Sequence, residues 1–174
     1  MLDEWKAMAY HLDTLTEEVH IAMVGKYTDL SDAYLSVIKS LQHAAMAVDR
    51  KLIIDWIEAS HLEDGWDEEE HKSAWGSLRE ADGILVPGGF GDRGIEGKIK
   101  AANYARTEGV PYLGICLGLQ IATIEFCRNV LGMTGANSTE FEDNPEHAAV
   151  VFMPEISKTH LGGTMRLGSR PTLW

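Results

Sequence analysis

The chain has 174 residues, of which 45% are hydrophobic and 24% are charged, a composition typical of one globular domain. Its 15 basic and 27 acidic residues give a formal net charge of −12, which disfavours binding to nucleic acid or to an anionic membrane surface. Two cysteines cannot build a disulfide framework, and neither a signal-like N-terminus nor an apolar run of about 18 residues occurs, so we expect a cytoplasmic protein.

Helix and strand patterns alternate along the chain. Apolar residues at helical spacing predict an amphipathic helix over residues 3–17, and Ser31 is a favourable N-cap for a helix that runs to about residue 48. An acid-rich stretch over residues 63–70 leads into a helix that ends near residue 81, and two further helices are predicted over residues 95–108 and 117–131. Buried strands are predicted over residues 21–25, 52–57, 83–87, 112–115 and 150–153.

This alternation predicts an α/β fold with a mostly parallel sheet and helices on both faces. Ligands of such sheets bind outside the carboxyl ends of the strands. Two loops lie at strand ends and carry chemical signals, Gly88–Gly94 and Cys116–Gly118. We therefore expect the functional site at that edge of the sheet.

The loop after the fourth predicted strand carries a nucleophile motif. Gly114-Ile115-Cys116-Leu117-Gly118 is the cysteine form of G-x-S-x-G, in which a strained strand-to-helix turn lifts the middle residue off the sheet. The amides that open the following helix favour a thiolate at Cys116, and the Leu117 amide faces a developing oxyanion. The competing interpretation is a buried structural cysteine whose glycine neighbours only allow close packing. Cys127, in mid-helix without glycines, is interpreted as core packing.

The glycine-rich loop Gly88–Gly94 follows the third predicted strand. It contains a literal G-x-G-x-x-G from Gly89 to Gly94, but no acidic residue ends the next strand, which excludes a dinucleotide site. A phosphate-binding P-loop also fails, because Ile99 stands where Ser or Thr is required. The remaining interpretation is a second oxyanion donor, a free backbone amide at the same sheet edge as Cys116. The alternative is a plain flexible turn.

These motifs resemble a known family. PGGFG, followed downstream by GICLG and Gln120, resembles the class I (triad type) glutamine amidotransferases. The series VGKYTDLSDAY, PGGFGDRGIEGKI, GICLGLQ, NSTEF and GGTMRLG is similar to the glutaminase domains of the CTP synthase family. The resemblance implies a flavodoxin-like, three-layer fold. It also implies that residues 1–18 are a linker helix from an absent synthase domain and that residues 19–174 are an amidotransferase domain incomplete at its C-terminus.

The resemblance implies hydrolysis of glutamine to glutamate and ammonia through a γ-glutamyl thioester on Cys116. The ammonia would serve a synthase domain that converts UTP to CTP with ATP and Mg²⁺, while the amidotransferase domain itself needs no cofactor or metal. The Gly89 and Leu117 amides would form the oxyanion hole, and Gln120 and Glu140 would hold the amino-acid end of glutamine. The implied substrate-binding residues are Gly88, Gly89, Phe90, Leu117, Gly118, Leu119, Gln120 and Glu140.

GGTMRLG resembles the loop that covers the site in this family and senses GTP as an allosteric effector. That lid loop would comprise Gly162, Gly163, Thr164, Met165, Arg166, Leu167 and Gly168. The further partners implied are glutamine, the synthase domain of the same full-length chain, and other copies in a homo-oligomer, a tetramer when full-length. No nucleic acid and no membrane are expected among the partners.

The catalytic His and Glu of the family lie further downstream than Trp174, so we expect this sequence to be partial and weakly active or inactive by itself. No histidine here fits the missing motif; the seven are His11, His20, His43, His61, His71, His147 and His160. Two alternatives stay open. One is another class I amidotransferase or a γ-glutamyl hydrolase, which NSTEF and GGTMRLG argue against. The other is a catalytically silent glutamine-binding or assembly module, which the reactivity of Cys116 would distinguish.

Overall fold

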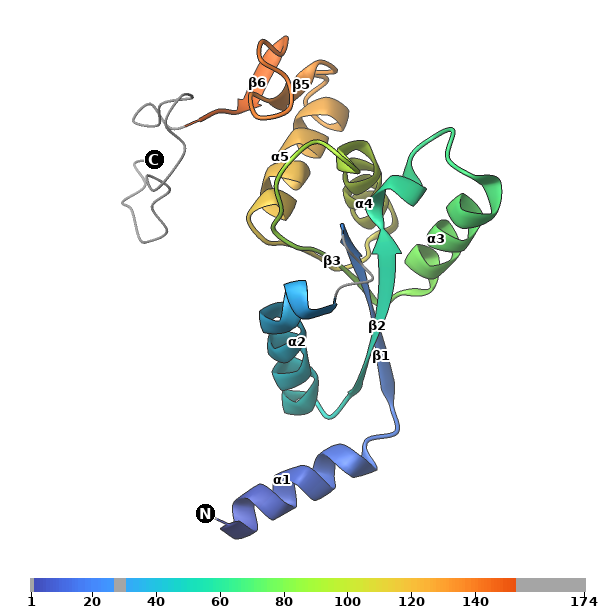
Figure 1. Ribbon diagram of the computed structural model, residues 1–174, viewed down its shortest axis with the longest axis vertical. Helices are drawn as coiled ribbons and strands as arrows, with labels where there is room; N and C mark the ends of the chain where they lie inside the picture. The colour runs from blue at the N-terminus through green and yellow to red at the C-terminus, as the bar shows by residue number, and fades with distance from the viewer. Residues whose placement is uncertain (1, 27–30, 153–174) are drawn as a thin grey trace.

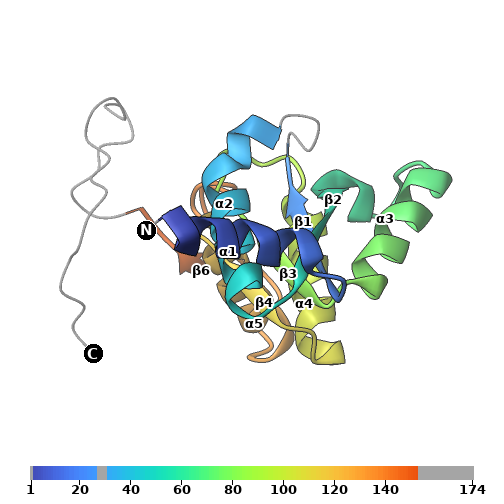
Figure 2. The ribbon, with the colours of Figure 1, turned by 90° about the horizontal axis from the view of Figure 1, so that it is seen from below.

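The computed structural model describes residues 2–26 and 31–152. The lid loop 162–168, residues 27–30 of the expected first loop and residue 153 of the expected last strand lie outside the described residues. Four parallel strands form the main sheet in the order β2-β1-β3-β4. Figure 1 labels β1, β2 and β3, and Figure 2 labels β4. Their bounds are Glu18–Gly25 for β1, Lys51–Glu58 for β2, Gly83–Val86 for β3 and Tyr112–Gly114 for β4.

Helices cover both faces of this sheet. The helices are α2 (Leu35–Ala47), α3 (Glu68–Glu80), α4 (Ile95–Glu108) and α5 (Leu117–Asn129), with short 3-10 helices η1 (Ser31–Tyr34) and η2 (Ala59–Leu62). Figure 1 shows α2 on one side of β1 and β2 and α3 on the other. The expected α/β fold with a mostly parallel sheet and helices on both faces is confirmed.

The core follows from the alternation of side chains along β1. Ala22 and Val24 contact a cluster with α3 and α4, whereas Met23 between them is fully buried toward the opposite face. A second apolar cluster joins α4 to α5. These two clusters fix α4 and α5, and with them the loops that enter both helices, at the carboxyl ends of β3 and β4.

The last predicted strand is wrong in position. The chain instead forms β5 (Ala136–Ser138) and β6 (His147–Val150), which pair in parallel as a separate two-stranded sheet. β5 is only three residues long and contains polar Asn137, so it carries no hydrophobic alternation that the sequence could reveal. Helix α2 also begins later than expected, at Leu35, because the chain first makes the 3-10 turn η1.

Helix α1 (Leu2–Thr14) lies beyond the amino end of β1, away from the strand ends that carry the motifs (Figures 1 and 2). It ends earlier than predicted, because β1 already pairs with β2 from Glu18 opposite Lys51. None of its residues is buried, and Trp5 is 62% exposed. A 2.7 Å contact from His11 to Asp49 ties α1 to the turn after α2. None of the described helices is long and apolar enough to span a membrane.

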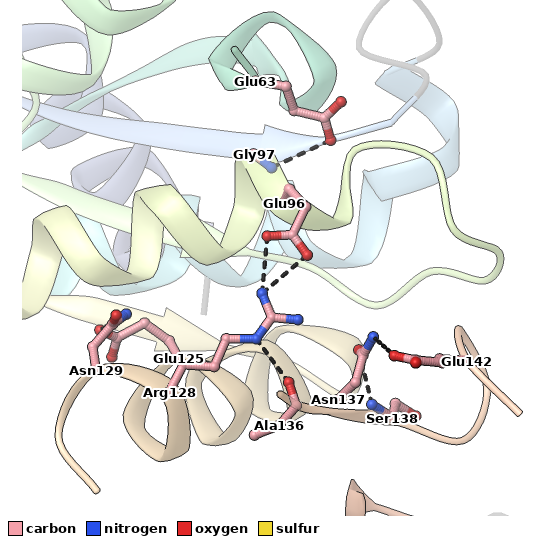
Figure 3. Close-up of polar contacts among 10 residues, drawn as sticks. All are labelled: Glu63, Glu96, Gly97, Glu125, Arg128, Asn129, Ala136, Asn137, Ser138 and Glu142. Carbon is pink, nitrogen blue, oxygen red and sulfur yellow. Dashed lines mark hydrogen bonds and ion pairs between the residues drawn. The ribbon is translucent and has the colours of Figure 1, made fainter. Parts of the chain in front are cut away.

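Helix α4 approaches η2 at backbone distance. The Gly97 amide donates to the Glu63 carboxylate at 3.3 Å, a contact drawn in Figure 3, and a Cβ on Gly97 would overlap the carbonyl oxygen of Ala59. Because the obstacle is backbone, a side-chain rotation cannot relieve it. Gly97 therefore determines how closely α4 packs against the end of β2.

We predict that Gly97→Ala lowers the free energy of unfolding by about 1–3 kcal/mol, because the added methyl forces α4 away from η2. Gly76→Ala in α3 is the matched control: its new Cβ has no atom within 4 Å, so the helix gains about 0.5–1 kcal/mol. Urea denaturation of both variants measures the two effects. Equal stabilities for the two variants would contradict the close packing at Gly97.

Candidate active site

Cys116 occupies a strained turn between β4 and α5. Its φ of 55° and ψ of −103° place a non-glycine residue in a sparsely populated backbone region, as the nucleophile motif predicts. Its side chain is exposed, and its carbonyl accepts the Leu119 and Gln120 amides at 3.1 and 3.2 Å. The turn is thus held by the first bonds of α5, with the sulfur accessible above the sheet.

The two glycines of the motif are required by close backbone contacts. A Cβ on Gly118 would overlap the carbonyl oxygen of Val86 at the end of β3. A Cβ on Gly114 would overlap the backbone of Gly118. Both glycines are therefore needed for close packing, as the alternative interpretation states. Cys116, in contrast, is exposed and is not a buried structural cysteine.

The glycine-rich loop after β3 packs directly against this turn. A Cβ on Gly88 would lie 3.4 Å from Cys116 Cβ, and one on Gly89 would lie 3.6 Å from Leu117 Cδ2. Within the described residues, neither the Gly89 amide nor the Leu117 amide donates to a protein acceptor. The two loops therefore place two unused N–H donors near an accessible thiol. Such a pair of donors stabilises an oxyanion.

Lys26 contacts the backbone of the glycine-rich loop with its ammonium group. This contact was not predicted from the sequence. Lys26 Nζ donates to the carbonyls of Phe90 at 2.8 Å and Gly91 at 3.0 Å, while its own backbone is hydrogen-bonded to the Tyr34 hydroxyl. Lys26 is only 6% exposed, and burial lowers the pKa of its ammonium. A buried cation thus fixes the carbonyls of the loop and leaves its amides for other partners.

Gln120 and Glu140 line one small pocket together. The pocket has a volume of about 70 Å³, and its remaining walls come from the ends of β5 and β6. Glu140 is exposed, and its backbone amide donates a hydrogen bond to Ser138 Oγ at 3.1 Å. Among the other predicted substrate-binding residues, Leu117 and Gly118 are buried, whereas Phe90 and Leu119 are exposed.

Arg128 anchors the segment that carries Glu140 (Figure 3). Its Nε donates to the carbonyl of Ala136 at 2.7 Å, and its NH1 group contacts both carboxylate oxygens of Glu96 at 2.9 and 3.0 Å. One side chain therefore joins α5, α4 and β5. No sequence motif marks Arg128, because its partners are distant in the chain and one of them is a backbone carbonyl.

The comparisons with known proteins agree with this geometry. The model of the class-I glutamine amidotransferase family matches residues 29–173. The chain belongs to the class-I glutamine amidotransferase family. A CTP synthase of Dictyostelium discoideum is 62% identical over 98% of the chain, and CTP synthase 1 of Homo sapiens is 52% identical over all of it. The chain spans only 31% of the length of the first of these relatives and 30% of the length of the second.

A solved structure of the same kind is also similar. The Trypanosoma brucei CTPS glutaminase domain with bound acivicin has a TM-score of 0.73 and 41% sequence identity, covering 81% of this chain and 53% of that one. The expected resemblance to glutaminase domains of CTP synthase is confirmed. So is the expected amidotransferase fold.

Among the described residues, no histidine is hydrogen-bonded to Cys116, the predicted nucleophile. The ring partners of the described histidines lie elsewhere, such as Asp55 for His20 at 2.9 Å and Trp75 for His71 at 3.1 Å. His160 lies outside the described residues. Across residues 2–26 and 31–152, no group of three or more His, Cys, Asp or Glu side chains is placed to hold a metal. Cys127 is half-buried and takes no part in this site.

We predict that Arg128→Met loosens the segment that carries Glu140 in this amidotransferase. Removing the charged donor leaves the Ala136 carbonyl without its partner and lowers the free energy of unfolding by about 1.5–3 kcal/mol. Hydrogen exchange at residues 136–142 accelerates as well. Arg50→Met, which removes an exposed ion pair to Glu17, is the control and changes stability by no more than about 0.5 kcal/mol. Unchanged exchange at residues 136–142 would disprove the anchoring role.

Proposed function

We propose that this chain is the glutamine-hydrolysing part of a CTP synthase. The observation that carries the proposal is the accessible Cys116 in its strained turn, with the unused Gly89 and Leu117 amides beside it. That set is suited to acyl transfer at a carboxamide carbon. Support also comes from the CTP synthases of 52% and 62% identity and from the glutaminase domain with bound acivicin.

In the proposed reaction, the Cys116 thiolate attacks the side-chain carboxamide carbon of glutamine. The carbonyl oxygen gains the negative charge and accepts hydrogen bonds that the Gly89 and Leu117 amides donate. The C–N bond then breaks and the nitrogen leaves as ammonia after gaining a proton, so that a γ-glutamyl thioester remains on Cys116. Water attacks the thioester, releasing glutamate and returning the thiol.

The pocket of Gln120 and Glu140 provides for the other end of the substrate. The exposed Glu140 carboxylate is a suitable partner for the α-ammonium group, and a charge-assisted hydrogen bond fixes that end in place. The amide side chain of Gln120 can both donate and accept. Because the pocket and the nucleophile lie on opposite ends of the first turn of α5, glutamine would be held across the helix N-terminus.

The remaining parts of the proposal concern the longer protein. Residues 19–174 would form the amidotransferase domain, and α1 within residues 1–18 would be the linker whose exposed apolar side chains contact the synthase domain. There ATP and Mg²⁺ would serve the amination of UTP to CTP, while the amidotransferase domain needs no cofactor. Residues 162–168 would act as the lid that senses GTP, and the protein would be a cytoplasmic homotetramer.

Labelling of the thiol by a chloroketone analogue of glutamine tests this proposal. We expect one adduct per chain, located at Cys116 by peptide mass and suppressed by L-glutamine but not by D-glutamine. Cys116→Ser should form no adduct, and Cys127→Ser, the matched control, should react like the wild type. Equal labelling of both cysteines, or labelling that L-glutamine does not suppress, would refute a glutamine site and favour a silent assembly module.

Turnover by the 174-residue chain is a separate prediction. Because no described histidine reaches Cys116, neither thiol deprotonation nor protonation of the leaving nitrogen is assisted, and we expect ammonia release from glutamine to be about 10²–10⁴-fold slower than in a complete CTP synthase. A coupled ammonia assay of both proteins gives the ratio. Comparable rates would show that a group within these 174 residues acts as the base.

A further inference from the structure

A second cavity adjoins the glycine-rich loop away from the pocket of Gln120 and Glu140. It has a volume of about 240 Å³ and shares Gly88, Gly89 and Leu117 with the oxyanion site, but neither Cys116 nor Glu140 lines it. The residues that line it come from the end of β1, from η1, from the loop after β3 and from α4 and α5. Its lining includes Gly25, Lys26, Gly88, Gly89, Lys98 and Leu117.

Lys98 lines this cavity with an ammonium group that has no hydrogen-bond partner among the described residues. The side chain is 2% exposed, and its Nζ makes no hydrogen bond. The two acids that act electrostatically on Lys98 contact other groups: Glu58 accepts from Ser60 Oγ at 3.0 Å and pairs with Arg93 at 3.6 Å, and Glu63 accepts from the Gly97 amide at 3.3 Å. A buried ammonium without hydrogen bonds is costly, and such groups in folded proteins normally have a partner.

The ammonium of Lys98 keeps its charge at neutral pH. Burial, followed by the charges of Lys26 and Arg93, lowers its pKa to about 8, while Glu58 and Glu63 oppose the shift. A pKa near 8 still leaves the protonated form dominant at pH 7. The cavity therefore has a positive charge for which no described residue provides a hydrogen-bond acceptor.

Lys26 adds a second cation to the same cavity. Two of its three N–H donors are used by the Phe90 and Gly91 carbonyls, so one remains without an acceptor in the part of the chain that the structure describes. Both lysines are buried, and their attraction for an anion is screened little by salt. The cavity therefore combines four unused ammonium N–H donors with room for only a small molecule.

We propose that this cavity binds a small oxyanion, a carboxylate or a phosphate, between Lys98 and Lys26. The anion would give Lys98 the acceptors that it lacks. Because Gly88 and Gly89 form part of the wall, an occupied cavity also restrains the loop that supplies the Gly89 amide to the oxyanion site. The cavity is distinct from the pocket of Gln120 and Glu140, since no residue lines both, but it adjoins the oxyanion site through Gly89 and Leu117.

Thermal unfolding of the 174-residue chain at pH 7 in phosphate, acetate and chloride of equal ionic strength tests the proposal. For the wild type, Tm rises with phosphate or with acetate relative to chloride, and the more effective ion identifies the ligand as a phosphate or a carboxylate. For Lys98→Met, Tm in chloride exceeds that of the wild type, because a buried unpaired charge is removed, and the response to either ion is lost. Lys100→Met, on the same helix but paired with Asp64, keeps the wild-type response.

A nuclear magnetic resonance titration of the Lys98 ¹³Cε resonance gives an independent reading that needs no stable variant. We expect the titration midpoint of Lys98 to lie near pH 8 in chloride. In the ion that raises Tm, the midpoint moves up by about one pH unit, because an opposite charge nearby favours the protonated form. An unchanged midpoint would overturn the proposal. So would an equal rise of Tm in the wild type and in Lys98→Met, which is a general effect of the salt.

Discussion

The site depends on a contact among three backbone segments that leaves no room for side chains. The end of β3, the end of β4 and the first turn of α5 meet at Val86, Gly114 and Gly118, where a Cβ on either glycine would overlap backbone atoms. This contact forces the chain to reverse within the residues between the two glycines. Cys116 therefore takes a strained conformation, its sulfur faces solvent, and the amide of the following residue is left for a ligand.

Charged side chains hold the surrounding elements, and their partners decide what each can do. Arg106 contacts the nearly buried Glu125 with three bonds of 2.8–3.0 Å, which secures α4 to α5. Arg128 extends the same interface to β5. In both cases the charge of the arginine is matched inside the protein, so its role is structural. Lys98 is as deeply buried as Glu125 but has no hydrogen-bond partner among the described residues, and this difference is the basis for the proposed anion site.

The sequence was most informative where structure is determined locally. The strand, the two glycines and the helix around Cys116 lie within a few residues of one another, so their spacing predicts both the turn and its chemistry. The glycine-rich loop could be placed near Cys116 because parallel strands end at the same edge. Strand β5, by contrast, is held by Arg128 and a parallel partner 11 residues further on, from Ala136 to His147, and neither contact leaves a periodic pattern. The burial of Lys98 is likewise invisible, since its position between Gly97 and Ile99 on α4 matters only once η2 and the loop after β3 pack around it.

The net charge of −12 imposes a further condition on what the two cavities can bind. Glutamine has no net charge, so the field of the whole protein neither attracts nor repels it, and local groups such as Glu140 decide its orientation. An oxyanion is repelled at long range, but that repulsion acts through solvent and decays over about 8 Å at physiological ionic strength. Buried ammonium groups act at contact distance, where screening is weak, and can therefore bind an anion against the average charge. In an acidic protein, an anion site therefore requires buried lysines. The positive charge of an exposed lysine would be offset by neighbouring carboxylates.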